Sequence, residues 1–251
     1  MKPESPFFKE SVQCLMQSPL FSDLKQGVVE EMISRCRHET WKRRRLLPME
    51  ETWQRFHILL SGRVRLSRSN PETGRMITLF LLGPGDPFCI FSLLDGKPHD
   101  VMLETLDDVS LLSLPMEKAR QWLGDHPELN CTLLPYLGEQ MCNLAGLAAD
   151  LALHDTETRL ARLILRHVDA PATVQQEHIS PRLINNLSNE SLAEMIGSVR
   201  VVVNRQLQHW KQEGIVDTHR GYLRVEKLDD LAQLAELRLA RTADTTPATL
   251  Q

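Results

Sequence analysis

Residues 188–216 decide the fold of the C-terminal part of this chain, and they read SNESLAEMIGSVRVVVNRQLQHWKQEGIV. Ser188 has the side chain of a good helix N-cap, and Ser191 then takes the N3 position. The apolar residues that follow at helical spacing are Leu192, Met195 and Ile196. Gly197 interrupts the pattern where a tight turn needs a residue without a Cβ. The stretch therefore predicts a short helix that ends in a glycine turn.

A second helix is expected to begin near Ser198. Its apolar residues at helical spacing are Val199, Val203, Leu207 and Trp210. The residues left on the opposite face are Arg200, Val201, Asn204 and Arg205. A helix, a glycine turn and a second helix with a polar outer face form the helix-turn-helix arrangement that reads DNA in the major groove. An ordinary helical hairpin with solvated arginines is the alternative.

The same residues resemble the Crp/Fnr family of bacterial transcription regulators. The similarity lies in residues 192–197 and 200–205, and residues 214–216 and 221–223 look like the small β-wing of that family. The resemblance implies a sequence-specific DNA-binding regulator that acts as a homodimer on a two-fold symmetric site in double-stranded DNA. It also implies RNA polymerase as a partner.

Base readout is expected from the second helix. Arg200 and Arg205 are the candidates for bidentate contacts to guanine, whereas Ser198 and Asn204 suit phosphate. Where the cyclic AMP receptors of the family carry a glutamate that reads cytosine, this chain has Val201. The order Arg-Val-x-Val-x-Arg is similar to the helix of the family's nitrogen-control regulators. The half-site is therefore expected to depart from TGTGA at the position which that glutamate reads.

Composition fits a globular regulator with a local basic surface. The chain has 251 residues, is 42% hydrophobic and 25% charged, and carries a formal net charge of −4. This length favours one or two domains, and the net charge excludes a generally basic protein. The basic residues near the second helix and the wing are Arg182, Arg200, Arg205, Lys211, Arg220 and Arg224. Because this footprint is modest, we expect affinity for DNA to depend on dimerisation.

No targeting or membrane segment is expected. No apolar run reaches the length that spans a bilayer, and the N-terminus lacks the apolar core of a signal peptide. We therefore expect a cytoplasmic protein with no membrane partner. The cysteines are widely spaced, which predicts neither a disulfide framework nor a zinc pattern: Cys14, Cys36, Cys89, Cys131 and Cys142.

The N-terminal part predicts an α+β fold. Residues 11–39 carry a helical apolar stripe, and short strands then follow at regular spacing. The expected strands are residues 56–60, 63–66, 76–82, 101–105 and 109–114. The phrase from Ile58 to Arg65, with Gly85-Asp86 further on, resembles a cyclic-nucleotide-binding β-roll.

A long helix is expected after the β-roll. Its apolar residues at spacings of three and four are Leu134, Leu137, Met141, Leu144, Ala148 and Leu151. This seam favours a two-stranded coiled coil between two subunits, and packing against the β-roll is the alternative. Pro135 is expected at the first turn, because proline lacks the amide that an inner turn needs. His154-Asp155 is expected to mark the end of the helix and the hinge.

These elements predict four segments. Residues 1–134 would form the sensor domain with its N-terminal helices, and residues 135–155 the dimerisation helix and hinge. Residues 156–240 would form the winged helix-turn-helix domain, and residues 241–251 a disordered tail.

The family resemblance points away from cyclic AMP as effector. In members that bind this nucleotide, a glutamate holds the ribose, and an arginine and a serine hold the phosphate. The matching positions carry Ile90, Asp100 and Val101 here. The two base-binding positions on the long helix carry Leu144 and Ala145. An aspartate beside a phosphate costs on the order of 1 kcal/mol, so cyclic AMP is not expected to bind.

The expected effector pocket is apolar instead. Its candidate residues are Phe88, Cys89, Ile90, Phe91, Val101, Leu137, Gly138, Leu144 and Ala145. Residues 85–89, Gly-Asp-Pro-Phe-Cys, resemble the haem-containing carbon monoxide sensors of the family, which makes Cys89 a candidate haem iron ligand. Phe91 stands where those sensors place a histidine, so His57 and His99 are substitute candidates. A buried thiol without a cofactor is the alternative reading of Cys89.

Catalysis is not expected. The sequence offers no phosphate-cradling glycine loop, nucleophile elbow or metal pair at ligand spacing. The competing functions are an effector-independent or thiol-responsive regulator, and a sensor module that acts through protein contacts without DNA.

Overall fold

The computed structural model describes residues 4–168, 181, 183–219 and 222–236. Residue contacts divide the chain into two compact units, residues 1–149 and residues 150–251. Each unit is described by itself. The expected tail at residues 241–251, together with Arg182, Arg220 and Gly221, lies outside the described residues.

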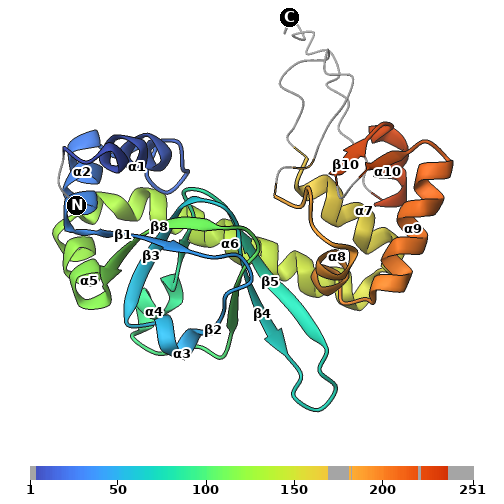
Figure 1. Ribbon diagram of the computed structural model, residues 1–251, viewed down its shortest axis with the longest axis horizontal. Helices are drawn as coiled ribbons and strands as arrows, with labels where there is room; N and C mark the ends of the chain where they lie inside the picture. Colours follow the sequence, from blue (N-terminus) through green and yellow to red (C-terminus); the bar gives the residue numbers. More distant parts are fainter. Residues whose placement is uncertain (1–3, 169–180, 182, 220–221, 237–251) are drawn as a thin grey trace, which may run out of the picture. The chain divides into compact units, whose positions relative to one another are not determined.

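Two four-stranded antiparallel sheets form the centre of the first unit (Figure 1). One has the order β1-β8-β3-β6, with β1 Arg37–Trp41, β8 Val109–Pro115, β3 Arg55–Ser61 and β6 Pro87–Phe88. The other has the order β2-β7-β4-β5, with β2 Leu46–Pro48, β7 Met102–Thr105, β4 Val64–Ser69 and β5 Met76–Leu82. The strands predicted from residue 56 onward are present, and the predicted α+β class is confirmed.

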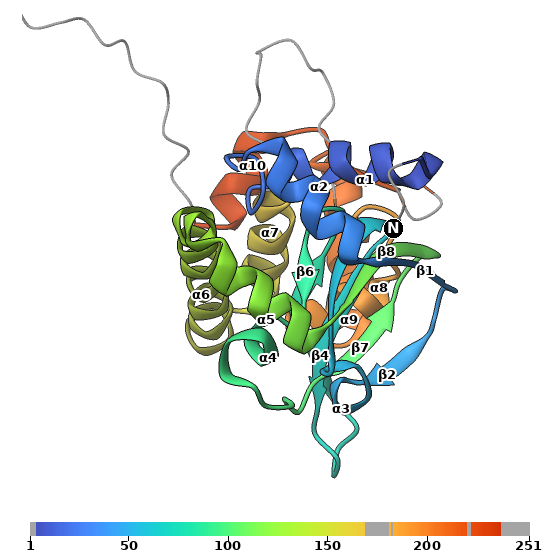
Figure 2. The same ribbon diagram turned by 90° about the vertical axis from the view of Figure 1, so that its left-hand side faces the viewer.

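Helices surround these sheets. They are α1 Pro6–Met16, α2 Gln26–Arg35, α3 Met49–Thr52, α4 Ile90–Asp95 and α5 Met116–Asp125. A 3₁₀ turn, Pro127–Leu129, leads into the long helix α6, Asn130–Leu153. Figure 2 shows α1 and α2 lying side by side, as in Figure 1, and their apolar faces close the core of the roll. The buried residues from these two helices include Leu15, Val29, Met32 and Ile33.

The expectation of helix throughout residues 11–39 was wrong. Helix α1 ends before Pro19, because a residue that precedes proline is pushed out of the helical region. Ser18 instead donates its hydroxyl to the Gly85 carbonyl at 3.0 Å. Residues 37–41 form strand β1, in which Trp41 opposes Val109 of β8. Pairing with β8 overrides a local sequence that does not alternate clearly.

The predicted start of the long helix at Pro135 was also wrong. Helix α6 begins at Asn130, five residues earlier, and contains Pro135. A proline at this position removes the bond to the carbonyl four residues before it, and its ring crowds that carbonyl. Burial of Leu129, Leu133 and Tyr136, each at most 5% exposed, stabilises these first turns. Tertiary packing therefore extends the helix past the position that proline alone favours.

The second unit is helical, with a two-stranded wing. Its elements are α7 Thr156–Arg166, α8 Asn189–Met195, α9 Arg200–Gln212, β9 Val216–His219, β10 Tyr222–Val225 and α10 Leu228–Leu234. Strands β9 and β10 pair antiparallel, with Val216 opposite Val225. The core is formed by residues at most 1% exposed, Leu160, Ile164, Val203, Trp210 and Leu231. The predicted winged helix-turn-helix is therefore confirmed.

Candidate nucleic-acid interface and effector cavity

The turn between α8 and α9 has the geometry that its sequence predicts. Ser188 caps α8, because its hydroxyl accepts the Ser191 amide at 3.1 Å. Gly197 has a φ of 63°, in the left-handed region that favours glycine. The Ser198 amide then donates to the Ala193 carbonyl at 2.8 Å, which closes the turn. These bonds fix the direction in which α9 leaves α8.

Helix α9 has one buried and one exposed face. Val203, Leu207 and Trp210 are at most 4% exposed and pack into the core. The four residues predicted to face DNA are all exposed: Arg200, Val201, Asn204 and Arg205. Ser198 lies half-buried in the turn. Val199 was expected on the apolar face, but it precedes the first helical residue and is 52% exposed.

One side-chain contact orients Asn204 on this outer face. Asn189 of α8 donates its amide to the Asn204 carbonyl oxygen at 3.1 Å. The bond occupies the acceptor of Asn204, so its NH₂ group is the part that suits a phosphate oxygen. The sequence had not indicated a role for Asn189, which lies fifteen residues away in the chain.

The wing is tied to the end of α9. Lys211 forms an ion pair with Asp217 at 2.7 Å and donates to the Thr218 carbonyl at 2.7 Å. The hydrogen bond from Lys211 lowers the pKa of the Asp217 carboxyl. Arg224 on β10 is exposed. Lys211 therefore bonds the wing to α9, and it also belongs to the basic residues predicted near the wing.

A cavity of about 260 Å³ opens in the first unit. Apolar side chains of β4, β5, α4, α6 and the segment between α4 and β7 form most of its wall. The lining residues predicted from sequence are Phe88, Cys89, Ile90, Phe91, Val101, Leu137 and Leu144. Gly138 and Ala145 do not line it, and both are exposed on α6. The helical period turns them away from the side of α6 that carries Leu137 and Leu144.

Several wall residues lie outside the predicted set of lining residues, although His99 was named as a substitute haem ligand and Asp100 as the residue at the phosphate position. They are Leu66, Arg68, Leu79, Phe80, Leu82, Pro87, Ser92, His99, Asp100, Tyr136 and Gln140. Strands β4 and β5 supply five of these, and they include the adjacent residues Leu79 and Phe80, so simple alternation does not predict this part of the wall. The hydroxyl of Tyr136 is engaged with Asp86, and burial raises the pKa of both groups. Tyr136 therefore contributes mainly apolar surface to the cavity.

Opposite charges meet in the cavity wall. Arg68 donates to Asp100 at 2.8 Å, and both side chains are largely exposed, at 58% and 89%. His99 lies beside Asp95, with 3.2 Å between Nε2 and Oδ2. Asp100, which the sequence comparison matched to a phosphate position, thus forms an ion pair with an arginine of the same wall. The wall carries no net excess of positive charge that would attract a phosphate.

Cys89 lies in the cavity wall with an unusual backbone. Its φ of 64° and ψ of 22° are left-handed, which costs a non-glycine residue about 1–2 kcal/mol. Its Sγ lies 3.8 Å from the Thr52 carbonyl oxygen and 3.9 Å from Oγ1. Burial raises the pKa of the thiol to about 12. Cys89 is therefore a protonated thiol at neutral pH.

His57, a substitute ligand candidate, does not line the cavity. Its ring stacks on Phe88 with centroids 4.5 Å apart and meets Trp41 edge-on. Burial lowers the pKa of His57 to about 3, so the imidazole is neutral. His57 therefore packs as an aromatic core residue.

Two family models match this chain. A Crp-like helix-turn-helix domain matches residues 158–234, and a cyclic nucleotide-binding domain matches residues 40–126. A CRP-like cAMP-activated global transcriptional regulator from Mycobacterium tuberculosis is 31% identical over 193 residues, covering 77% of this chain and 81% of that protein. The chain belongs to the Crp/Fnr family of transcription regulators. The family resemblance seen in the sequence is therefore confirmed.

Other relatives agree with this assignment. A global nitrogen regulator from Nostoc is 32% identical over 179 residues, covering 69% of this chain and 78% of that protein. A solved structure of a CooA mutant from Carboxydothermus hydrogenoformans has a TM-score of 0.68 at 22% identity, covering 82% of this chain and 90% of the other. That likeness concerns the fold. The curated relatives are regulators and not enzymes.

This Crp/Fnr protein is a DNA-binding transcription regulator with a domain of the cyclic-nucleotide-binding type. Among the described residues, no helix is both long and apolar enough to cross a membrane.

Proposed function

We propose that this regulator binds a two-fold symmetric DNA site as a homodimer, and that a small molecule other than cyclic AMP controls it through the cavity. The observation that carries the effector proposal is the wall itself, which is apolar and pairs Asp100 with Arg68. Its place of action would be the cytoplasm, with RNA polymerase as a partner.

The exposed face of α9 supports the DNA-binding part of the proposal. Arg200 and Arg205 lie there with Val201 between them in sequence, while Trp210 anchors the other face. A dimer would place two such helices in successive major grooves, about 34 Å apart. A gel shift with random-sequence DNA separates this function from a sensor that acts through protein contacts alone.

The exposed apolar residues of α6 support the homodimer. Leu134 is 64% exposed, Met141 is 69% exposed and Leu151 is 38% exposed. Leu137 and Leu144, from the same repeat, line the cavity. A ligand in the cavity would therefore touch the helix that forms the seam. Replacing Leu134, Met141 and Leu151 with charged residues should yield monomers that bind DNA weakly, as measured by sedimentation and anisotropy.

A neutral, mainly apolar ligand fits the cavity best. A cavity of about 150 Å³ with apolar walls holds one benzene ring, so 260 Å³ suits a molecule of about two fused rings. A phosphate would have to compete with Asp100 for Arg68, and this ion pair leaves no excess positive charge in the wall to attract it. Cyclic AMP is therefore a poor ligand in this proposal.

Haem is a second candidate, favoured by Cys89 in an apolar wall. The residues fit it poorly, however. The cavity of about 260 Å³ suits about two fused rings, whereas haem is a four-ring macrocycle. The Cys89 thiol is buried against Thr52, and burial raises its pKa, so haem binding would have to displace this contact and remove the thiol proton. The raised pKa also disfavours a thiol-responsive regulator, because a protonated, buried Cys89 thiol would react slowly.

Ligand-induced shifts in Tm test the effector proposal, because a ligand of the folded state raises Tm. Naphthol, naphthalene and naphthoate form a matched set that differs in one group. We expect naphthol and naphthalene to raise Tm and naphthoate and cyclic AMP to have no effect. Val101→Trp, which would fill the cavity, should abolish the shift. A response to cyclic AMP alone would contradict the proposal.

The haem alternative has a separate readout. Protein reconstituted with haem would show an absorbance band that Cys89→Ala alters. A spectrum that is the same with and without Cys89 would remove this thiol as a ligand.

A further inference from the structure

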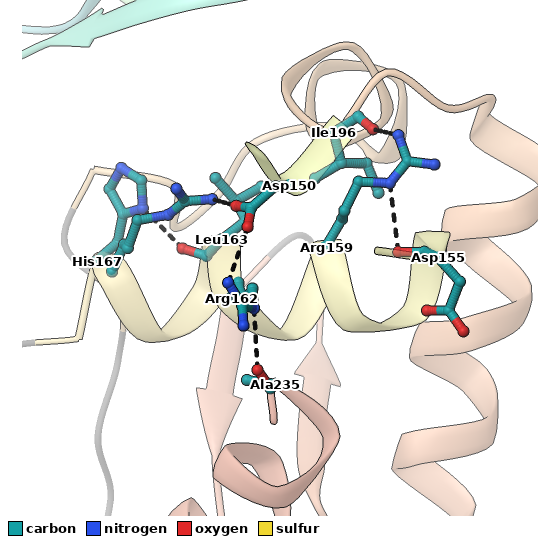
Figure 3. Close-up of polar contacts among 9 residues, drawn as sticks. Asp150, Asp155, Arg159, Arg162, Leu163, His167, Ile196 and Ala235 are labelled. Atoms are coloured by element: carbon teal, nitrogen blue, oxygen red, sulfur yellow. Dashed lines mark hydrogen bonds and ion pairs between the residues drawn. The ribbon is translucent and has the colours of Figure 1, made fainter. Parts of the chain in front are cut away.

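Asp150, in the last turn of α6, is a buried carboxylate held by two arginines (Figure 3). Its Oδ1 lies 3.0 Å from Arg162 Nη1, and its Oδ2 lies 2.6 Å from Arg166 Nη2. The Asp150 side chain is 4% exposed. Arg162 and Arg166 are four residues apart on α7, so they lie on one face of that helix and reach the same carboxylate.

This carboxylate is not explained by α6 itself. The last turn of a helix carries partial negative charge, so an aspartate there is unfavourable alone. A buried charge also needs a partner for each of its oxygens. The two arginines of α7 supply positive charge and one partner for each oxygen. Asp150 therefore joins the end of α6 to α7 by charge-assisted bonds.

Helix α7 is in turn bonded to the helix-turn-helix. Arg162 also donates from Nε to the Ala235 carbonyl at the end of α10, at 2.9 Å. Figure 3 shows Arg159 donating to the Ile196 carbonyl, at 2.8 Å, where α8 ends. Glu157 accepts the indole N–H of Trp210 on α9 at 3.0 Å. Helix α7 is thus bonded to the end of α6, to α9 and to the ends of α8 and α10.

We infer that Asp150 is a positioning residue that makes the last turn of α6, helix α7 and the DNA-reading helices one rigid body. Any bending that changes the position of α9 would then take place in α6 before Asp150. The sequence had suggested a hinge at His154-Asp155. The structure instead bonds this stretch at both ends, because the His154 amide donates to the Asp150 carbonyl at 3.1 Å and Asp155 caps α7 at 2.8 Å.

Hydrogen exchange of the full chain tests the rigid body without DNA. In the wild type, amides 151–154 should exchange as slowly as those of α7. In Asp150→Asn, which keeps the shape and loses the charge, they should exchange at least tenfold faster while α9 keeps its protection. Arg166→Gln, a milder change, should give a smaller effect in the same segment. Uniform loss of protection across α7–α10, or no change in residues 151–154, would overturn the inference.

A matched pair of glycine substitutions locates the bend. Ala149 and Ala152 are both exposed on α6, on either side of Asp150, and glycine softens a helix equally at either position. This test rests on the proposed DNA binding. Ala149→Gly should weaken binding to a selected DNA site about fivefold or more. Ala152→Gly should change it less than twofold, because this segment is already held.

Combining these substitutions tests whether Asp150 holds the last turn of α6. In the Asp150→Asn background, Ala152→Gly should weaken DNA binding as much as Ala149→Gly does in the wild type. Equal effects of the two glycines in the wild type would contradict the inference, as would a neutral Ala152→Gly in the Asp150→Asn background. Absence of wild-type binding to any DNA would reject the proposed function instead, and the exchange result would still decide the rigid body.

Discussion

Trp210 of α9 donates its indole N–H to Glu157 of α7 at 3.0 Å, while its ring is completely buried. The bond connects α9, the proposed DNA-reading helix, with α7, the helix that carries Arg159 and Arg162. Because the donor is buried, water cannot replace the carboxylate if it is removed. The orientation of α9 therefore depends on an acidic residue more than fifty positions earlier in the chain.

Replacing Glu157 tests this dependence. Glu157→Ala should lower the free energy of unfolding by about 1–3 kcal/mol, because a buried N–H loses its acceptor. Glu157→Gln keeps an oxygen at the same place and should lose about half as much or less. Urea unfolding followed by tryptophan fluorescence measures both. Equal losses for the two variants would show that the hydrogen bond is not the cause.

The second unit could be predicted closely from its sequence. Its signals are local: Ser188 caps a helix, Gly197 takes a positive φ, and Val203, Leu207 and Trp210 follow at helical spacing. Each of these requires only neighbours within a few residues in the chain. This is why the exposed residues of α9 could be predicted from the sequence.

The features that were missed depend on distant contacts. Strand β1 exists because β8 pairs with it, and α6 extends through Pro135 because Leu133 and Tyr136 are buried. The partner of Asp100 in the cavity wall, Arg68, lies thirty-two residues away. Periodicity carries no information about such pairs, so the wall could be predicted as apolar but its ion pair could not.

A second prediction concerns the pair formed by Arg65 and Glu104, which lie directly opposite each other on β4 and β7. Their shortest distance is 2.6 Å, and their side chains are 8% and 21% exposed. Arg65→Met should cost about 3 kcal/mol, because it leaves a mostly buried carboxylate without its cation. Thermal and urea unfolding measure this loss.

The double variant is the control for this pair. Arg65→Met combined with Glu104→Met should be more stable than Arg65→Met alone, because two apolar side chains replace the pair without leaving a charge. If the two changes add independently, the pair contributes no coupling and the interpretation fails.

A third prediction concerns acid stability. The pKa of His57 is lowered from 6.5 to about 3 in the folded state, so the unfolded chain binds the proton first as pH falls. The stability due to the neutral imidazole is complete above pH 6.5. It is lost between pH 6.5 and about 3, at up to about 1.4 kcal/mol per pH unit.

His57→Phe removes this titration and keeps an aromatic ring against Phe88. The variant should lose less stability than the wild type between pH 6.5 and 4, by urea unfolding at each pH. Near-ultraviolet circular dichroism at pH 7.5 checks that it folds. Parallel losses in the two proteins would show that His57 does not contribute to the acid response.

The last prediction concerns base recognition by α9. Selection from random DNA should return a two-fold site whose half-sites differ from TGTGA at the position that a glutamate would read in place of Val201. Val201 offers no acceptor for cytosine and is 76% exposed. Arg200→Ala should lower affinity by about 1–3 kcal/mol and relax one base position, as bidentate contacts to guanine do. Ser198→Ala should instead weaken binding to all sequences alike, because phosphate contacts carry no sequence information.

Val201→Glu should move the preferred half-site toward TGTGA. Recovery of TGTGA half-sites by the wild type would exclude this role for Val201, and a uniform loss in Arg200→Ala would place that arginine on the phosphate backbone.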